Sequence, residues 1–126
     1  MNFRSYLLER FGISLPYFLE LEEGSKKVIA YSGKKEGEKY GLIAAKKSDI
    51  GYKPTSNFLQ LYGGLAIRNV ISLTKKEALA YARGEDIRIG GNKRGFVVVM
   101  QGSSCLGCGL VKDGQLINQI PKVRRI

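Results

Sequence analysis

The two cysteines of the chain, Cys105 and Cys108, are separated by two residues and followed by Gly109. This C-x-x-C-G spacing fits three kinds of structure: half of a zinc knuckle, a redox pair, or two small residues of a strand. A structural zinc ion needs four ligands, whereas the chain has two thiols and no histidine. A redox pair of the thioredoxin type needs its first thiol at the start of a helix, whereas strand-like residues and an Asp-Gly turn follow here. We interpret both cysteines as small apolar strand residues whose thiols point to opposite faces, with a metal or redox site as the alternative.

No other constellation of side chains requires an enzyme. Histidine, the commonest general base, is absent, and no glycine-rich phosphate loop occurs. Acidic residues gather at Glu20, Glu22 and Glu23 and again at Glu85 and Asp86, where a solvated helix end and a loop are the simplest explanations. We therefore predict that the protein is not an enzyme and has no cofactor.

Gly107 and Gly109 alternate in the same stretch as the cysteines. Glycine weakens a strand unless the strand bends or another backbone comes close, and alternate glycines suit a small, strongly curved sheet. They would also leave backbone uncovered, where a flat ligand could approach.

The charge of the chain indicates a polyanionic partner. The sequence has 126 residues, with 21 Lys and Arg against 11 Asp and Glu, a net charge of +10 and a pI near 9.8. The positive charge is concentrated toward the end, because residues 87–126 carry seven basic side chains and one acidic one, whereas residues 1–25 are net negative. Nucleic acid is the commonest partner of a domain this basic.

Helical and strand-like segments are mixed along the first two thirds of the chain. Asn2 and Gly12 bound a predicted helix over 3–11, and Ser14–Leu21 predicts a second short helix. Strands are expected at 28–32 and 42–47, joined by a polar hairpin tip at 32–41. A central helix is predicted to begin at Pro54 and to end at Gly63-Gly64, followed by a strand at 68–73. A capping box at Thr74–Glu77 opens another helix, which Gly84 closes.

The last third of the chain predicts a β-meander. Residues 95–100, 105–112 and 115–120 are strand-like, and Asp113-Gly114 has the composition of a two-residue hairpin turn. The whole pattern predicts an α+β fold with a small, curved or barrel-like sheet. No apolar run reaches the length of a membrane span and no export signal is recognisable, so we expect a cytoplasmic protein with reduced thiols.

The meander resembles the closing strands of the PUA-like RNA-binding domain, in the form found at the C-terminus of Sun-family rRNA cytosine-5 methyltransferases. Leu106, Gly107 and Gly109 match the Leu-Gly-x-Gly step of that family. The later positions of the family pattern are matched by Gly114, Leu116, Asn118, Pro121, Lys122 and Arg125. The upstream segment Ala82–Ile87 also resembles the family pattern, so the likeness covers about the last half of the chain.

The sequence departs from the family at two positions and lacks its catalytic part. Cys108 stands where an aromatic or aliphatic residue is usual, and Leu110 replaces a basic residue for which Lys112 could substitute. The cofactor loop and catalytic cysteine motif of the methyltransferases are absent. The resemblance therefore implies the RNA-binding attachment standing alone.

The resemblance implies a single PUA-like domain over 1–126, with residues 1–25 as a helical N-terminal extension and 26–126 as a small mixed β pseudo-barrel with flanking short helices. It implies binding of structured rRNA or tRNA, as an accessory to RNA modification or ribosome assembly. The expected RNA-binding residues are Lys53, Lys93, Arg94, Lys112, Asn118, Lys122, Arg124 and Arg125. For Asn118 and Pro121, a turn at the strand end is the competing interpretation, and Tyr52, Phe58 and Tyr62 are expected in the core. The alternative function is a protein-interaction module that recruits a separate RNA-modifying enzyme.

Overall fold

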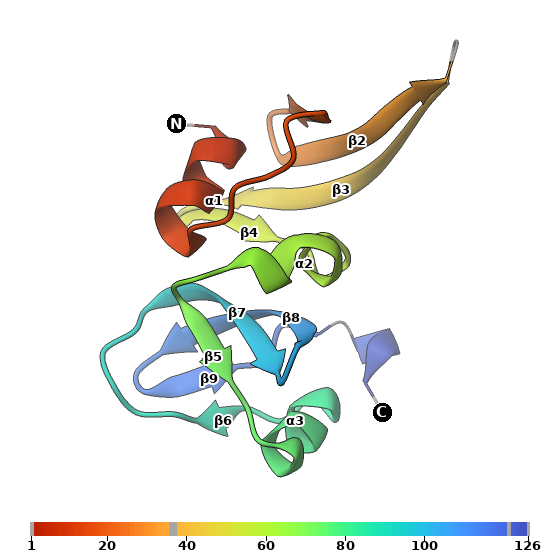
Figure 1. The fold of residues 1–126 in the computed structure, drawn as a ribbon. Helices are drawn as coiled ribbons and strands as arrows, with labels where there is room; N and C mark the ends of the chain where they lie inside the picture. Colours follow the sequence, from red (N-terminus) through yellow and green to blue (C-terminus); the bar gives the residue numbers. More distant parts are fainter. Residues whose placement is uncertain (1, 36–37, 121, 126) are drawn as a thin grey trace.

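Two β-sheets and three α-helices make up the described part of the chain (Figure 1). The computed structural model describes residues 2–35, 38–120 and 122–125, and for residues 32–35, 38–40 and 124 it describes the backbone and not the side chain. The first sheet is antiparallel throughout, with the order β1-β2-β3-β4. Its strands are β1 (Leu19–Glu23), β2 (Lys27–Lys35), β3 (Glu38–Ser48) and β4 (Gly51–Pro54).

The second sheet has five strands in the order β5-β7-β8-β9-β6, and β5 runs parallel to β7 whereas the other pairs are antiparallel. Its strands are β5 (Val70–Ser72), β6 (Ile87–Arg88), β7 (Gly95–Gln101), β8 (Ser104–Lys112) and β9 (Gln115–Ile117). The helices are α1 (Phe3–Phe11), α2 (Ser56–Tyr62) and α3 (Lys75–Ala82), with the 3-10 turns η1 (Gly63–Leu65) and η2 (Lys122–Arg124). One sheet is curled into a half-barrel, so the predicted α+β class is confirmed. Among the described residues, no helix has the length and apolar character needed to cross a membrane.

The helix ends follow the capping signals in the sequence. The Asn2 side chain accepts a hydrogen bond from the backbone N–H of Ser5, and Gly12 ends α1 in the left-handed conformation. Thr74 and Glu77 form the predicted capping box at the start of α3, each side chain accepting from the backbone N–H of the other. Both helices therefore confirm the sequence prediction.

The predicted second helix at 14–21 is wrong. Leu19 to Glu23 form β1, in which Leu19 is buried and Leu21 partly buried while Glu20 and Glu22 are exposed. This alternation has the period of a strand, and pairing along β2 supplies the backbone with partners that a short helix after Pro16 would lack. The predicted helical extension at 1–25 is thus a helix followed by a strand.

Three other boundaries differ from the sequence prediction. Pro54 ends β4 opposite Ala45, and Thr55 caps α2 instead, because its hydroxyl accepts from the Phe58 N–H at 3.2 Å. The strand predicted at 68–73 is confined to β5, and the strand predicted at 115–120 ends at Ile117. The polar hairpin predicted at 32–41 is largely strand, since β2 and β3 pair as far as Lys35 and Glu38, and its tip at 36–37 lies outside the described residues.

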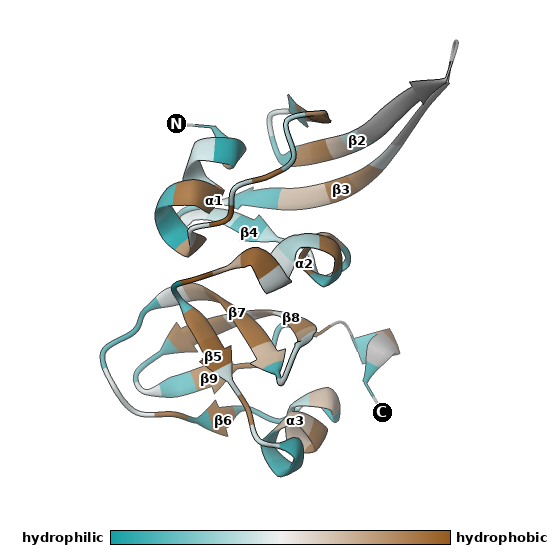
Figure 2. Ribbon diagram, in the orientation of Figure 1, coloured by the Kyte–Doolittle hydropathy of each residue, from teal (hydrophilic) through white to brown (hydrophobic). Residues whose placement is uncertain are grey.

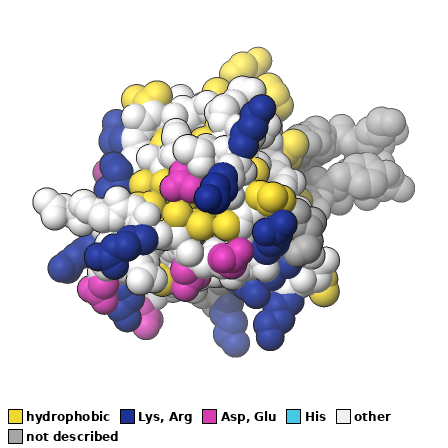
Figure 3. All heavy atoms as spheres, turned by 90° about the horizontal axis from the view of Figure 1, so that it is seen from below, with side chains coloured by type: hydrophobic (Ala, Val, Ile, Leu, Met, Phe, Trp, Pro, Cys, Tyr) yellow, Lys and Arg dark blue, Asp and Glu magenta, His cyan; other side chains and the backbone are white. Residues whose placement is uncertain are grey.

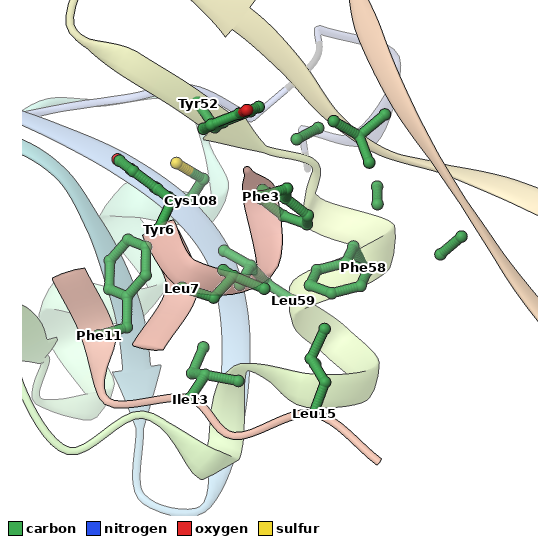
Figure 4. Packing of buried hydrophobic residues seen from close by; sticks show 14 of the residues in the cluster. Phe3, Tyr6, Leu7, Phe11, Ile13, Leu15, Tyr52, Phe58, Leu59 and Cys108 are labelled. Atoms are coloured by element: carbon green, nitrogen blue, oxygen red, sulfur yellow. The ribbon is translucent and has the colours of Figure 1, made fainter. Parts of the chain in front are cut away.

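A first core cluster joins α1, α2 and both sheets. Phe3 is fully buried, and its ring centroid lies 5.3 Å from those of Tyr52 and Phe58 (Figure 4). Tyr62 packs against the same cluster, so the expectation that Tyr52, Phe58 and Tyr62 belong to the core is confirmed. Because Val98 of the second sheet also belongs to it, the two sheets share one core.

A second core cluster lies between the other face of the five-stranded sheet and α3, around Tyr81 and Leu116. Along β7, Phe96 and Val98 belong to the first cluster and Val97 and Val99 to the second. Burial on both faces explains why this strand is a continuous apolar run in the sequence, and Figure 2 shows β7 as hydrophobic along most of its length.

Candidate nucleic-acid interface

Cys105 and Cys108 lie on β8 and pack on the same side of the sheet. A β-bulge causes this, because Val99 pairs with Gly107 and Met100 with Cys105, which leaves Leu106 as an extra residue. Both cysteines pack in the first core cluster, whereas Leu106 packs against the second. The prediction that the thiols diverge is therefore wrong, because a sequence pattern assumes a regular strand and does not reveal the bulge.

Burial makes both thiols poor nucleophiles. Burial raises the pKa of the Cys108 thiol to about 12, although the positive charge of Lys53 acts to lower it. Burial also raises the pKa of the Cys105 thiol. Both cysteines are unbridged. No group of three or more His, Cys, Asp or Glu side chains suited to a metal ion occurs within the described ranges. This environment favours the interpretation of the cysteines as small apolar residues.

We expect native protein at pH 8 to leave Cys108 unmodified by iodoacetamide, and the denatured chain to react at both thiols. Because the folded pKa of Cys108 is raised from 9.0 to about 12, its neutral thiol contributes stability that is present below pH 9 and is lost as the pH rises toward about 12. Burial and the hydrogen bond to Glu23 raise the pKa of Tyr52 to about 12, which acts in the same direction. Peptide mass spectrometry measures the labelling of each thiol, and melting curves between pH 8 and 12 measure the loss of stability. Rapid labelling of Cys108 in the native protein would contradict the burial argument.

Both glycines of β8 are required by close packing. Gly107 has a φ of +128°, and a Cβ there would lie 2.6 Å from the Ser56 hydroxyl of α2. A Cβ at Gly109 would collide with Leu116 and would lie 2.9 Å from Val99. The bulge at Leu106, next to Gly107, agrees with the curvature expected of this strand. The expected uncovered backbone is wrong, because side chains of neighbouring elements cover both glycines.

Three of the predicted RNA-binding residues come together at the start of β7 and the end of β8. Gly95 pairs with Val111, so Arg94 and Lys112 lie beside each other across the hairpin, and the exposed Lys93 immediately precedes them. The next hairpin, between β8 and β9, is closed by the predicted Asp113-Gly114 turn, whose two residues both have positive φ, 51° and 76°, as the type I′ turn requires.

Arg94 and Lys112 line a groove of about 610 Å³ between α1 and the five-stranded sheet. We call it the arginine groove; it is lined by Tyr6, Arg10, Ile50, Arg94, Gly95, Phe96, Leu110, Val111, Lys112 and Asp113. Its walls combine apolar side chains with three basic groups and one acid. Such a mixture can hold phosphate groups at its rim and the apolar surface of a sugar or base within it.

Arg10 is a functional candidate that the sequence does not reveal. Its Nε and Nη2 donate to the Phe96 carbonyl at 3.0 and 2.8 Å, and Nη2 also donates to the Arg94 carbonyl. Gly95, at φ +84°, lets the guanidinium approach, since a Cβ there would lie 3.2 Å from Nη2. These bonds hold α1 against β7 and leave Nη1 without a hydrogen-bond partner among the described residues. No local sequence pattern predicts the role of Arg10, because the carbonyls that its side chain contacts are more than 80 residues away in the chain.

Lys53 lies elsewhere, beside a second groove of about 420 Å³ between β3, β4 and α2. We call it the lysine groove; its lining includes Ile43, Lys46, Lys53, Ser56, Cys108 and Gln119. Among the described side chains, Lys47 is the one base that forms an ion pair, at 3.7 Å from Glu23. The basic side chains of both grooves are therefore without a carboxylate partner in the described part of the chain.

Asn118 is a structural residue. It is 8% exposed, its Nδ2 donates to the carbonyls of Tyr81 and Glu85, and its Oδ1 accepts from the Ile120 N–H at 2.9 Å. Both side-chain N–H groups are thus used within the protein, and the turn after β9 depends on them. These bonds favour the competing interpretation of Asn118, a turn at the strand end, over direct contact with RNA.

The C-terminal basic residues do not join the arginine groove. Figure 1 shows η2 on the opposite side of the molecule from the loop that joins β6 to β7. Lys122 is exposed, whereas the partly buried Arg125 donates from Nε to the Ile120 carbonyl at 3.1 Å and packs over Gly84. The side chain of Arg124, and Pro121 as a whole, lie outside the described residues.

The surface at this end of the molecule carries charges of both signs. Figure 3 shows Lys and Arg side chains around the face seen from below, with acidic side chains between them. The charges on this face are therefore mixed in sign.

The comparison with protein families identifies the second half of the chain. The family described as Methyltransferase RsmF PUA domain matches residues 68–126, which contain all strands of the five-stranded sheet together with α3 and η2. No curated protein matches the chain in a sequence search. The matched region is a PUA domain without a catalytic domain, and PUA domains are generally associated with RNA binding. By this match, residues 68–126 belong to the Methyltransferase RsmF PUA domain family.

Proposed function

We propose that the protein is an RNA-binding module that recognises structured rRNA or tRNA through the arginine groove. It acts by binding and not by catalysis, without a cofactor, as an accessory to RNA modification or ribosome assembly. The family match supports RNA as the partner. The two unbridged cysteines support a reducing, cytoplasmic setting.

The observation that carries the proposal is the convergence of Arg10, Arg94 and Lys112 on one groove. Their charges come from α1, from the loop before β7 and from the end of β8, and no carboxylate of the described residues pairs with them. Each can contact a phosphate and release its condensed counterions. A groove between a helix and a sheet, lined by basic and apolar side chains, suits recognition of RNA by shape and backbone more than by base edges.

The first core cluster supports the further proposal that residues 1–126 act as one domain. It contains side chains from α1, from the first sheet and from β7 and β8. Arg10 is held in the groove by hydrogen bonds to the β7 backbone, so the two halves of the chain build the groove jointly.

Titration of RNA binding with salt tests the proposed function. We expect a labelled RNA hairpin to bind wild-type protein with a Kd of about 1 µM or tighter at low salt. With three phosphate contacts, the slope of log K against log salt should be about −2 to −3. A DNA duplex of the same sequence should bind more weakly, because its groove dimensions and sugar differ. Absence of binding at low salt, or a slope near zero, would contradict the proposal.

Exposed apolar side chains favour protein recruitment as the second candidate function. Tyr17, Phe18 and Ile67 are 95%, 60% and 75% exposed, and the ring centroids of Tyr17 and Phe18 lie 5.8 Å apart. A stable protein partner that remains bound after nuclease treatment, and that a Tyr17→Ser, Ile67→Ser variant does not retain, would favour this function over RNA binding.

A further inference from the structure

Three lysines form a row across the first sheet. In the strand register Lys27 lies opposite Lys46, and Lys46 lies opposite Lys53. Residues directly opposite in adjacent antiparallel strands share a face and have neighbouring Cβ atoms, so the three side chains emerge side by side. The neighbouring Lys47 points to the other face, where it pairs with Glu23. We call Lys27, Lys46 and Lys53 the lysine row.

The lysine row is unfavourable in the isolated protein. Like charges directly opposite each other destabilise a sheet, and no described carboxylate lies within ion-pair distance of the row. A lysine on an edge strand can protect that edge against pairing with other chains, but this explains only Lys53 on β4. Lys27 and Lys46 lie on the interior strands β2 and β3. A row of this kind is explained by an anionic ligand that offsets the repulsion.

The row leads into the lysine groove. Lys46 and Lys53 line this groove together with the polar side chains Ser56 and Gln119 and with the exposed Ile43. The groove therefore offers two cationic groups, hydrogen-bonding side chains and an apolar surface in one place. This is the chemistry that binds the phosphates and a base or sugar of a nucleic-acid strand.

Both grooves are lined by β8 and by residues in or just before β4, and we call the surface that runs along β8 between them the seam. The lysine groove is lined by Lys53 and Cys108, and the arginine groove by Ile50, just before β4, and by Lys112 at the end of β8. From Cys108 to Lys112 the strand rises by about 13 Å. A single RNA strand is long enough to follow the seam from one groove to the other.

We propose that the lysine row and the lysine groove bind a single-stranded segment that flanks the structured RNA held in the arginine groove. This inference rests on the proposed function and adds a second contact surface to it. The proposed ligand is the phosphate backbone of that segment.

The test compares a Lys46→Gln, Lys53→Gln variant with a Lys75→Gln, Lys76→Gln control. The control removes two exposed lysines from α3, at the end of the molecule remote from the first sheet (Figure 1). Binding is measured by fluorescence anisotropy with an RNA hairpin and with the same hairpin carrying a single-stranded extension at its 5′ or 3′ end. Wild-type protein should bind the extended RNA more tightly, and the Lys46/Lys53 variant should lose about tenfold on that RNA, with little change on the hairpin.

A second readout needs no RNA. Relief of repulsion in the row should raise the Tm of the Lys46/Lys53 variant by about 1–4 °C at low salt, an effect that high salt removes. The inference is overturned if the extension does not tighten wild-type binding, or if the variant keeps the gain. Failure of wild-type protein to bind the hairpin itself contradicts the proposed function instead, so the two failures are distinguishable.

Discussion

Replacing Arg94 and Lys112 together with glutamate should weaken binding of an RNA hairpin by about 100-fold or more. The two side chains lie beside each other at the rim of the arginine groove, and reversal of both charges turns attraction for phosphate into repulsion. The salt dependence should fall with the affinity, by about one unit of slope for each phosphate that the variant no longer binds. Fluorescence anisotropy over a range of salt concentrations measures both quantities.

The matched control is Lys75→Glu, Lys76→Glu, which changes the net charge by the same amount. Both lysines are exposed in the first turn of α3, where acidic side chains are favourable, so this variant should fold at least as well as the wild type. Arg10 is not used for this test, because it also holds α1 to β7 and its loss would change the fold. Equal loss of affinity in both variants would mean that only the overall charge matters.

Asn118→Ala should lower the free energy of unfolding by about 2–4 kcal/mol, since it removes three hydrogen bonds from a buried turn. The carbonyls of Tyr81 and Glu85 and the N–H of Ile120 would lose their partner. Denaturant titration followed by circular dichroism measures the change. Below its melting transition, the folded variant should bind RNA with an unchanged Kd, because Asn118 does not line the arginine groove and its side-chain N–H groups are bonded within the protein.

Two further variants test whether the loss of stability comes from the hydrogen bonds of the Asn118 amide. Asn118→Asp keeps the size of the side chain but replaces the amide N–H groups with a carboxylate that faces two carbonyls, so it should destabilise at least as much as alanine. Asn92→Ala, in the exposed loop before β7, should change stability by less than about 0.5 kcal/mol. A normal stability of Asn118→Ala combined with weaker RNA binding would restore Asn118 to the interface.

Local signals in the sequence predict much of this fold. The Asn2 cap, the Thr74–Glu77 capping box and the Asp113-Gly114 turn each act through atoms a few residues apart, so their geometry follows from residue type and spacing. The β7-β8-β9 meander is predictable for the same reason, since two short hairpin connections fix its pairing. The resemblance found in the sequence also rests on this contiguous region, and the family match covers it.

The features that could not be predicted depend on contacts between distant segments. The segment at 14–21 has a composition compatible with a helix, and its pairing with β2 decides that Leu19 begins a strand. The bulge at Leu106 shifts Cys105 onto the face of Cys108, and only the register with β7 reveals it. Arg10 reaches the arginine groove because α1 packs against a strand that follows it by more than 80 residues.

The structure places the predicted RNA-binding residues on separate surfaces, because contacts between distant segments decide where each of them lies. Lys93, Arg94 and Lys112 are brought together by the β7-β8 hairpin, whose strands can be predicted from the sequence. These three predicted RNA-binding residues therefore lie close together. Lys53 belongs to the other groove, and Lys122 and Arg125 lie near α3. Closeness in the sequence or similarity of charge does not decide which basic residues share a surface.

The most direct measurement of where RNA binds is photo-crosslinking with a hairpin that carries 4-thiouridine, followed by mass spectrometry of the crosslinked peptides. If RNA occupies the arginine groove, the crosslinks should map to α1 around Tyr6 and Arg10 and to the two strand segments around Arg94–Phe96 and Leu110–Asp113. Crosslinks confined to α3 or to η2, with none on these segments, would contradict the central claim.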